Sequence, residues 1–264
     1  AGLGRLCIKQ QKWQQATGYY EQAVRRDPNF AVAYRSLANL YTQQGQLEQA
    51  AEYRYQAVRL RPDWATPLNQ LKLGNLFLDF KQIDRAIACY QHGLQIQPNF
   101  QTYYTLAAVL TAERRWAEAT IAYQNALQIN PDHADSYYGL CKVAEQQNDL
   151  QKALAYCQQT VERSPNSFAA CYTLGTLFLK LKRWEDAALA YQQALALKPD
   201  FAWSHHNLGY VLLQQGRLQE AGDRLQYATQ HLSASPWSYC HLAEVFNQQG
   251  QWGQASAAFL KAVQ

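Results

Sequence analysis

The chain has 264 residues, of which 48% are hydrophobic and 17% are charged, and its formal net charge is +4. Its 24 basic residues are scattered, so no run of Lys and Arg indicates a nucleic-acid or membrane-surface patch. The apolar runs are far shorter than a membrane span, so we expect no membrane insertion, and no signal peptide opens the chain.

The six cysteines include no C-x-x-C pair, so their spacing fits neither a disulfide framework nor a zinc site. Reduced thiols in a cytoplasmic protein are the expectation. The chain contains no methionine, even at position 1, and it opens within a helical pattern. We interpret it as a segment of a longer protein.

The chain repeats itself about every 34 residues, and each repeat contains a leucine followed by a small residue. These anchor leucines are Leu3, Leu37, Leu73, Leu106, Leu140, Leu174, Leu208 and Leu242. Thirteen residues after each anchor stands an alanine, at Ala16, Ala50, Ala86, Ala119, Ala153, Ala187, Ala221 and Ala255. A proline follows twenty-five residues after each of the first six anchors. This regularity predicts eight structural units, the first and last of them incomplete.

Each unit is predicted to contain two short amphipathic helices. In the first helix, the anchor and the residues one and four positions after it fall on one face at about 100° per residue. A polar turn follows, in which Gly45, Gly216 or Gly250 supplies a left-handed helix stop. The second helix begins on an apolar residue, buries the alanine and usually an aromatic side chain, and ends before the proline. The second helices are expected to begin at Trp13, Leu47, Ile83, Trp116, Leu150, Trp184, Leu218 and Trp252.

This pattern closely resembles the tetratricopeptide repeat (TPR) over essentially the whole chain. The resemblance implies an all-α fold, a right-handed superhelical solenoid of antiparallel helix pairs, and we expect residues 1–264 to form a single solenoid. The chain departs from the family pattern at Arg54 and Cys157, which stand where tyrosine is usual. Two extra residues also occur around Thr66-Pro67.

The resemblance favours a protein–protein interaction scaffold that binds a peptide segment or a partner helix in a concave groove lined by the first helices. The alternative is a non-catalytic, substrate-recruiting or regulatory arm of a larger enzyme, such as a glycosyltransferase. Self-association through uncapped solenoid ends is a third possibility. No phosphate loop, H-E-x-x-H or G-x-S-x-G motif is present, so we expect neither catalysis nor a cofactor.

Side chains on the first helices that point away from the buried stripe are the candidates for partner binding. They are Arg35, Asn39, Asn75, Tyr104, Tyr138, Lys142, Tyr172, Thr176, Trp203, His206, Asn207 and Tyr210. Tyr104, Tyr138, Tyr172 and His206 form a row on four consecutive repeats, and aromatic side chains are common binding hot spots. A second interpretation is open: these rings stack on neighbouring first helices and seal the solenoid.

Two known TPR ligand sites do not match this sequence. Arg35 and Asn39 fit the opening pair of the dicarboxylate clamp of chaperone-binding repeats, but Lys72 stands where that clamp requires asparagine. The asparagine ladder of O-linked N-acetylglucosamine transferases is matched only by Asn207.

A metal site and an RNA channel are also disfavoured. His205 and His206 point about 100° apart on a helix, and no carboxylate or thiol lies at ligand spacing, so His205 is expected to be a packed residue. The charges on the inner face are mixed rather than basic, which argues against nucleic-acid recognition.

Overall fold

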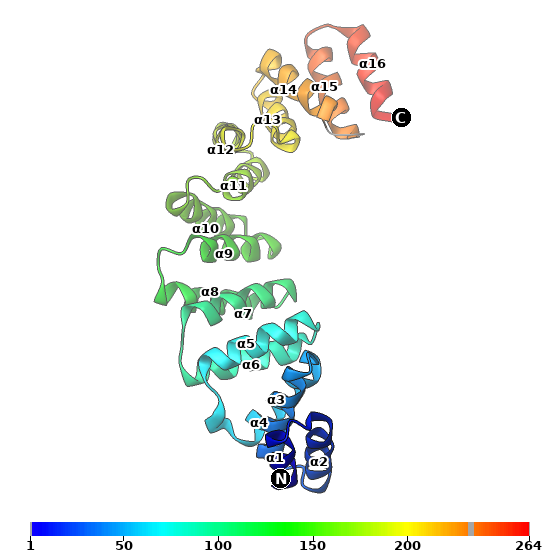
Figure 1. Ribbon diagram of the computed structural model, residues 1–264. Helices are drawn as coiled ribbons and strands as arrows, with labels where there is room; N and C mark the ends of the chain where they lie inside the picture. The colour runs from blue at the N-terminus through cyan, green and yellow to red at the C-terminus, as the bar shows by residue number, and fades with distance from the viewer. Residues whose placement is uncertain (1, 232–234, 264) are drawn as a thin grey trace. The chain divides into compact units, whose positions relative to one another are not determined.

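The computed structural model describes residues 2–231 and 235–263, and within them the regular structure is helical (Figure 1). The helices divide between two compact units, residues 1–129 and 130–264. The first unit contains α1 (Gly2–Lys9), α2 (Trp13–Arg26), α3 (Ala31–Gln43), α4 (Leu47–Leu60), a short 3-10 helix η1 (Pro62–Trp64), α5 (Pro67–Asp79), α6 (Ile83–Ile96), α7 (Phe100–Ala112) and α8 (Trp116–Ile129). The second unit contains α9 (Ala134–Gln146), α10 (Leu150–Arg163), α11 (Phe168–Lys180), α12 (Trp184–Leu197), α13 (Ala202–Gln214), α14 (Leu218–His231), α15 (Pro236–Gln248) and α16 (Trp252–Val263).

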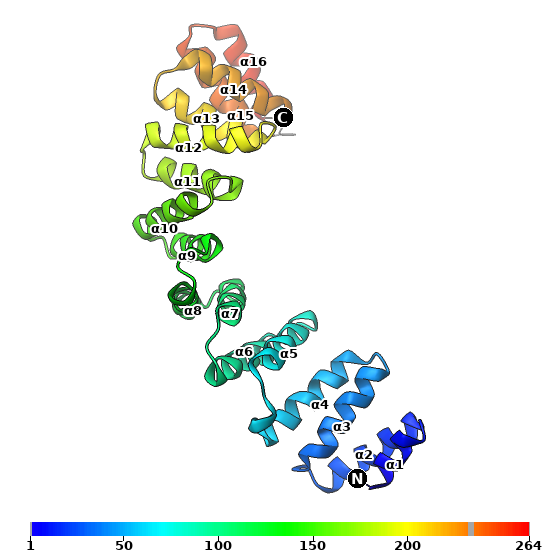
Figure 2. The same cartoon turned by 60° about the vertical axis from the view of Figure 1, so that its left-hand side comes forward.

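Each predicted repeat is one helical hairpin, as Figure 2 shows from a second direction. An odd-numbered helix packs against the even-numbered helix that follows it, and within each unit that helix packs against the next hairpin. All eight second helices begin at the apolar residue predicted from the sequence, from Trp13 to Trp252. The all-α class of paired helices is therefore confirmed. Among the described residues, none of the helices is both long and apolar enough to cross a membrane.

The two helices of a hairpin approach closely because small residues lie where they cross. The alanine at position +13, counted from the anchor leucine, is buried in every repeat. The small residue at +1 lies against the side chain at +17: a Cβ added to Gly175 would be 2.8 Å from the Tyr191 ring, and one added to Gly74 would be 2.4 Å from the Tyr90 ring. Tyr90 and Tyr191 are fully buried as a result. The rings fill the space that the small residues leave open.

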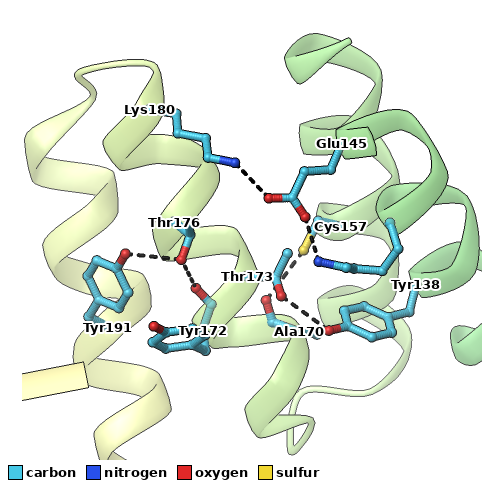
Figure 3. A network of polar contacts seen from close by, with 10 residues as sticks. Tyr138, Glu145, Cys157, Ala170, Tyr172, Thr173, Thr176, Lys180 and Tyr191 are labelled. Carbon is cyan, nitrogen blue, oxygen red and sulfur yellow. Dashed lines mark hydrogen bonds and ion pairs between the residues drawn. The ribbon is translucent and has the colours of Figure 1, made fainter. Parts of the chain in front are cut away.

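The fifth repeat fills the same crossing with two sulfur atoms. Cys141 at +1 and Cys157 at +17 are both fully buried, as expected for cysteine acting as a small hydrophobe. Hydrogen bonding between the two thiols, together with burial, raises the pKa of Cys157. The thiol of Cys157 also donates to the carbonyl oxygen of Ala170 at 3.3 Å, which ties α10 to α11 (Figure 3).

One anchor leucine differs from the rest. Leu3 is exposed, whereas Leu37 and the six later anchors are buried. Within each unit, the second helix of one hairpin packs against the first helix of the next, which carries the next anchor.

The turn inside every hairpin contains one residue in the left-handed backbone region. It lies eight positions after the anchor, with φ between 57° and 76°, at Gln11, Gly45, Lys81, Arg114, Asn148, Lys182, Gly216 and Gly250. The glycines expected to stop the first helices are thus confirmed. The other five repeats place a side chain in a conformation that L-residues adopt at a cost of about 1–2 kcal/mol.

We expect Lys182→Gly to raise the free energy of unfolding by about 0.5–1 kcal/mol, because glycine adopts a φ of 57° without a Cβ clash. Gln192→Gly, at an exposed position inside α12, should instead lower it by about 1 kcal/mol. Urea denaturation measures both effects. If both substitutions changed the free energy of unfolding in the same direction, the left-handed backbone conformation at Lys182 would be contradicted.

We expect Ala187→Leu to cost about 1–3 kcal/mol, because the side chain at +13 in α12 has no space to enlarge. Ala196→Leu, an exposed position on the same helix, is the matched control and should leave stability nearly unchanged. Thermal unfolding is the measurement. Equal melting temperatures for wild type and Ala187→Leu would overturn the repeat register.

Candidate functional site

The predicted partner-binding residues lie on first helices of both units. In the first unit, Arg35 and Asn39 are on α3, Asn75 is on α5 and Tyr104 is on α7. The first three are exposed and Tyr104 is half-buried. The remaining predicted residues lie in the second unit, which is a separate compact unit.

In the first unit, three of these side chains already have neighbours. The guanidinium of Arg35 lies 4.1 Å from the centre of the Trp64 ring, a cation–π contact. Tyr90 donates its hydroxyl hydrogen to Asn75 Oδ1 at 2.7 Å. The Tyr104 ring packs against Tyr123, with 6.1 Å between ring centres.

In the second unit, hydrogen bonds connect successive first helices. The hydroxyl of Tyr138 on α9 lies 3.2 Å from Thr173 Oγ1 on α11 (Figure 3). Asn207 Nδ2 on α13 donates to the Tyr172 hydroxyl on α11 at 3.1 Å. In both cases a tyrosine two positions before one anchor contacts the residue immediately before the next anchor. The two tyrosines are half-buried, and their polar tips hold neighbouring repeats together.

An acidic side chain adds a second connection between α9 and α11. Glu145 accepts from Lys180 Nζ at 2.8 Å, as Figure 3 shows. It also accepts from Lys142 Nζ at 2.6 Å. The Glu145 side chain is only 12% exposed. Burial by itself raises the pKa of Glu145. The two ammonium groups lower this pKa by more than burial raises it, so the net shift is downward. Lys142, predicted as a binding residue, is therefore already paired within the protein.

Thr176 is also engaged inside its own hairpin. Its Oγ1 donates to the carbonyl oxygen of Tyr172 at 3.0 Å and lies 3.2 Å from the Tyr191 hydroxyl (Figure 3). The contact fixes the polar tip of a ring that otherwise lies in the core.

His206 differs from its predicted environment, because it is buried rather than exposed. Only 7% of the residue is accessible, and its Nδ1 lies 2.7 Å from Ser238 Oγ on α15. The ring of His241 covers it, with 5.3 Å between ring centres. An angular offset from the anchor could not reveal this, because the covering side chains come from the next repeat.

Trp203 and Tyr210 lie beside this histidine. The Trp203 indole meets His206 edge to face and is still 43% exposed. Tyr210 is half-buried between Trp184 and His241. Two successive first helices, α13 and α15, thus carry a continuous group of aromatic rings.

His205, the neighbour of His206 in sequence, is packed as expected. It is buried, its Nε2 lies 2.8 Å from the carbonyl oxygen of Pro199, and its ring packs against Tyr227 with 4.0 Å between ring centres. Within residues 2–231 and 235–263, no three His, Cys, Asp or Glu side chains gather in a geometry for a metal ion.

Several residues at these surfaces were not identified as site candidates. Glu145, Trp237 and His241 occupy first-helix positions that face outward or toward the next repeat. Trp64 lies in the segment around the two-residue insertion, and Arg54 is the departure from tyrosine noted in the sequence. The two inserted residues and the replacement of tyrosine by Arg54 mark the second repeat as unusual in the sequence, but neither shows where a side chain lies.

Acid should destabilise the second unit through its buried histidines. Burial, and to a smaller extent His241, lowers the pKa of His206 to about 4. The unfolded chain binds a proton near pH 6.5 that the folded chain excludes. Stability is therefore lost as the pH falls from about 6.5 to about 4, and the His206 contribution is about 3 kcal/mol.

We expect His206→Gln to flatten this dependence, even though the substitution also weakens the contact with Ser238 at neutral pH. The measurement is the free energy of unfolding in urea at pH 7.5 and pH 4.5 for both proteins. If the free energy of unfolding changes by the same amount between pH 7.5 and pH 4.5 in wild type and variant, His206 is not the source of the acid destabilisation.

Comparisons with known proteins agree with the hairpin architecture. Models of the tetratricopeptide repeat match residues 2–63, 70–100 and 110–174, and a TPR-repeat model matches residues 175–216. Solved structures with the same fold include YrrB, described as a TPR protein with an unusual peptide-binding site (TM-score 0.62, 19% identity, 66% of this chain and 90% of that chain). MamA is another (TM-score 0.59, 20% identity, 62% and 90%).

Among curated proteins, the chain is similar to the peroxisomal targeting signal receptor of Candida glabrata, with 39% identity over 72 residues, or 27% of this chain and 12% of the receptor. It also matches Hsp70-Hsp90 organizing protein 1 of Glycine max, with 31% identity over 98 residues, or 37% and 17%. The chain spans less than a fifth of the length of either relative. The repeat-model matches, the eight hairpins and the shared fold lead to one conclusion: the chain belongs to the tetratricopeptide-repeat family.

Proposed function

We propose that this chain is a non-catalytic protein-interaction scaffold that binds an extended peptide or a partner helix across its first helices. Its relatives support a binding role, since they are named as a targeting-signal receptor and a chaperone-organizing protein. YrrB, which shares the fold, is described by its peptide-binding site.

The observation that carries the proposal is a pair of exposed tryptophans on adjacent first helices. Trp203 on α13 is 43% exposed and Trp237 on α15 is 68% exposed, and both lie five positions before their anchor leucine. Large aromatic side chains bury much area while freezing few rotatable bonds, so they are typical binding hot spots. Contact with His206 holds the Trp203 ring in place before a ligand arrives.

The remaining predicted residues have different parts in this proposal. Trp203, Arg35, Asn39 and Asn75 are the exposed members, available for direct contact. Tyr138 and Tyr172 use their hydroxyls between repeats, so their direct role in binding stays a prediction. A few aromatic anchors of this kind support micromolar affinity, about −8 kcal/mol.

A random dodecapeptide library displayed on phage provides the test. We expect peptides selected on the wild-type chain to bind Trp203→Ala/Trp237→Ala at least tenfold more weakly, because the aromatic anchors are lost. Fluorescence anisotropy with the synthetic peptides measures the affinity.

Trp252→Ala is the matched control, since Trp252 is 67% exposed but begins a second helix, α16. It should retain wild-type affinity. Equal binding by all three proteins, or selection of no peptide at all, would contradict a groove on α13 and α15.

A further inference from the structure

The second repeat lacks the buried side chain that fills the helix crossing in the neighbouring repeats. At position +17, Tyr20, Tyr90, Tyr123 and Tyr191 are buried, whereas Arg54 is exposed. An arginine cannot leave its charge in an apolar core, so its head remains in solvent. The space that a tyrosine would occupy stays open.

The segment between α4 and α5 enlarges this opening. It is longer than the other described connections in the first unit, and it folds as η1 before Thr66 caps α5. Consequently α4 lies less closely against α5 than α2 does against α3. Two pockets result on either side of Arg54, with volumes of about 330 and 280 Å³.

The chemistry of these pockets is cationic and rich in hydrogen-bond donors. Arg35 and Arg54 line the first pocket, and Arg54 and Lys72 line the second. Among the described residues, none of these three cations has an ion-pair partner. Among the described residues, the single acidic side chain that lines the two pockets is Asp79, in the second.

An amide group lies among these charges. Gln70 on α5 lines the first pocket, and no hydrogen bond within the described residues involves its side-chain amide. Only 2% of the residue is exposed, but its amide oxygen and nitrogen are not among the fully buried polar atoms that lack a partner. The amide can therefore donate a hydrogen bond to an acceptor that enters the pocket.

Trp64 gives the first pocket a fixed wall. Its ring carries the Arg35 guanidinium at 4.1 Å, which orients that cation. The two arginines therefore come from different helices, α3 and α4, and line one pocket together with Gln70 on α5. Guanidinium groups recognise carboxylate and phosphoryl oxygens with paired hydrogen bonds.

We propose that this cleft, defined by Arg35, Arg54, Gln70 and Lys72, binds an oxyanion side chain of an acidic peptide. The inference deepens the proposed function, on which the choice of a peptide ligand rests. The site differs from the dicarboxylate clamp of chaperone-binding repeats, whose residues all lie on first helices, because Arg54 at its centre lies on a second helix, α4. The oxyanion is the carboxylate of Asp or Glu, or the phosphoryl group of a phosphorylated residue, and both present the same acceptor oxygens.

The probes are fluorescein-labelled octaglutamate and, as an uncharged control, octaglutamine, titrated at about 0.1 M salt to screen distant charges. We expect octaglutamate to bind the wild-type chain and octaglutamine to bind at least tenfold more weakly. An octapeptide in which phosphoserine alternates with glycine distinguishes the two sources: the tighter of the two anionic peptides identifies the preferred oxyanion.

Three variants locate the site. Arg54→Tyr restores the family residue and should fill the opening as Tyr123 does beside Ala107, while Arg54→Gln removes the charge alone. Both should weaken octaglutamate binding at least tenfold. Arg59→Gln removes one exposed cation from elsewhere on the same helix and should change the affinity less than twofold.

Trp203→Ala/Trp237→Ala should bind octaglutamate like the wild type, so failure of this site and failure of the aromatic groove give different results. Equal loss of affinity in Arg54→Gln and Arg59→Gln would mean that net charge alone attracts the peptide, and would overturn the proposal. Octaglutamate that binds no better than octaglutamine would also overturn it.

Discussion

The close crossing of the two helices in each hairpin is the constraint on which the rest of this structure depends. Small residues at +1 and +13 allow the backbones to approach, and in most repeats a larger side chain at +17, usually a tyrosine, fills the remaining volume. Gly175 shows how tight the fit is, because an added Cβ would lie 2.8 Å from the Tyr191 ring. This close approach of the two helices determines which leucines are buried and in which direction the outward side chains point.

Departures from that crossing show what the constraint permits. Cys141 and Cys157 fill the fifth crossing with two medium-sized side chains instead of a small one and a large one. Arg54 cannot fill the second, because its charge requires solvent, and the neighbouring hairpins separate into a cationic cleft. The residue at +17 is thus part of the packed core in most repeats and lines a cationic cleft in the second.

Contacts between successive first helices occupy part of the surface that those helices present. Tyr138, Tyr172 and Asn207 face outward from their own hairpins, but their polar groups are hydrogen-bonded between neighbouring first helices. Trp203 and Trp237 remain exposed. Stacking within a repeat array therefore reduces the number of outward side chains that a ligand could contact.

The 34-residue spacing is sufficient to predict the eight hairpins, the first residue of each second helix and the left-handed turns at the glycines, because all of these depend on periodicity within one hairpin. Other features depend on the distance to a neighbouring hairpin, which no offset in the sequence contains. The burial of His206 under His241, the contact of Lys180 with Glu145, the stacking of Arg35 on Trp64 and the division into two compact units are of this kind. A helical offset determines the direction of a side chain around its own axis, whereas the packing of adjacent repeats decides what it meets.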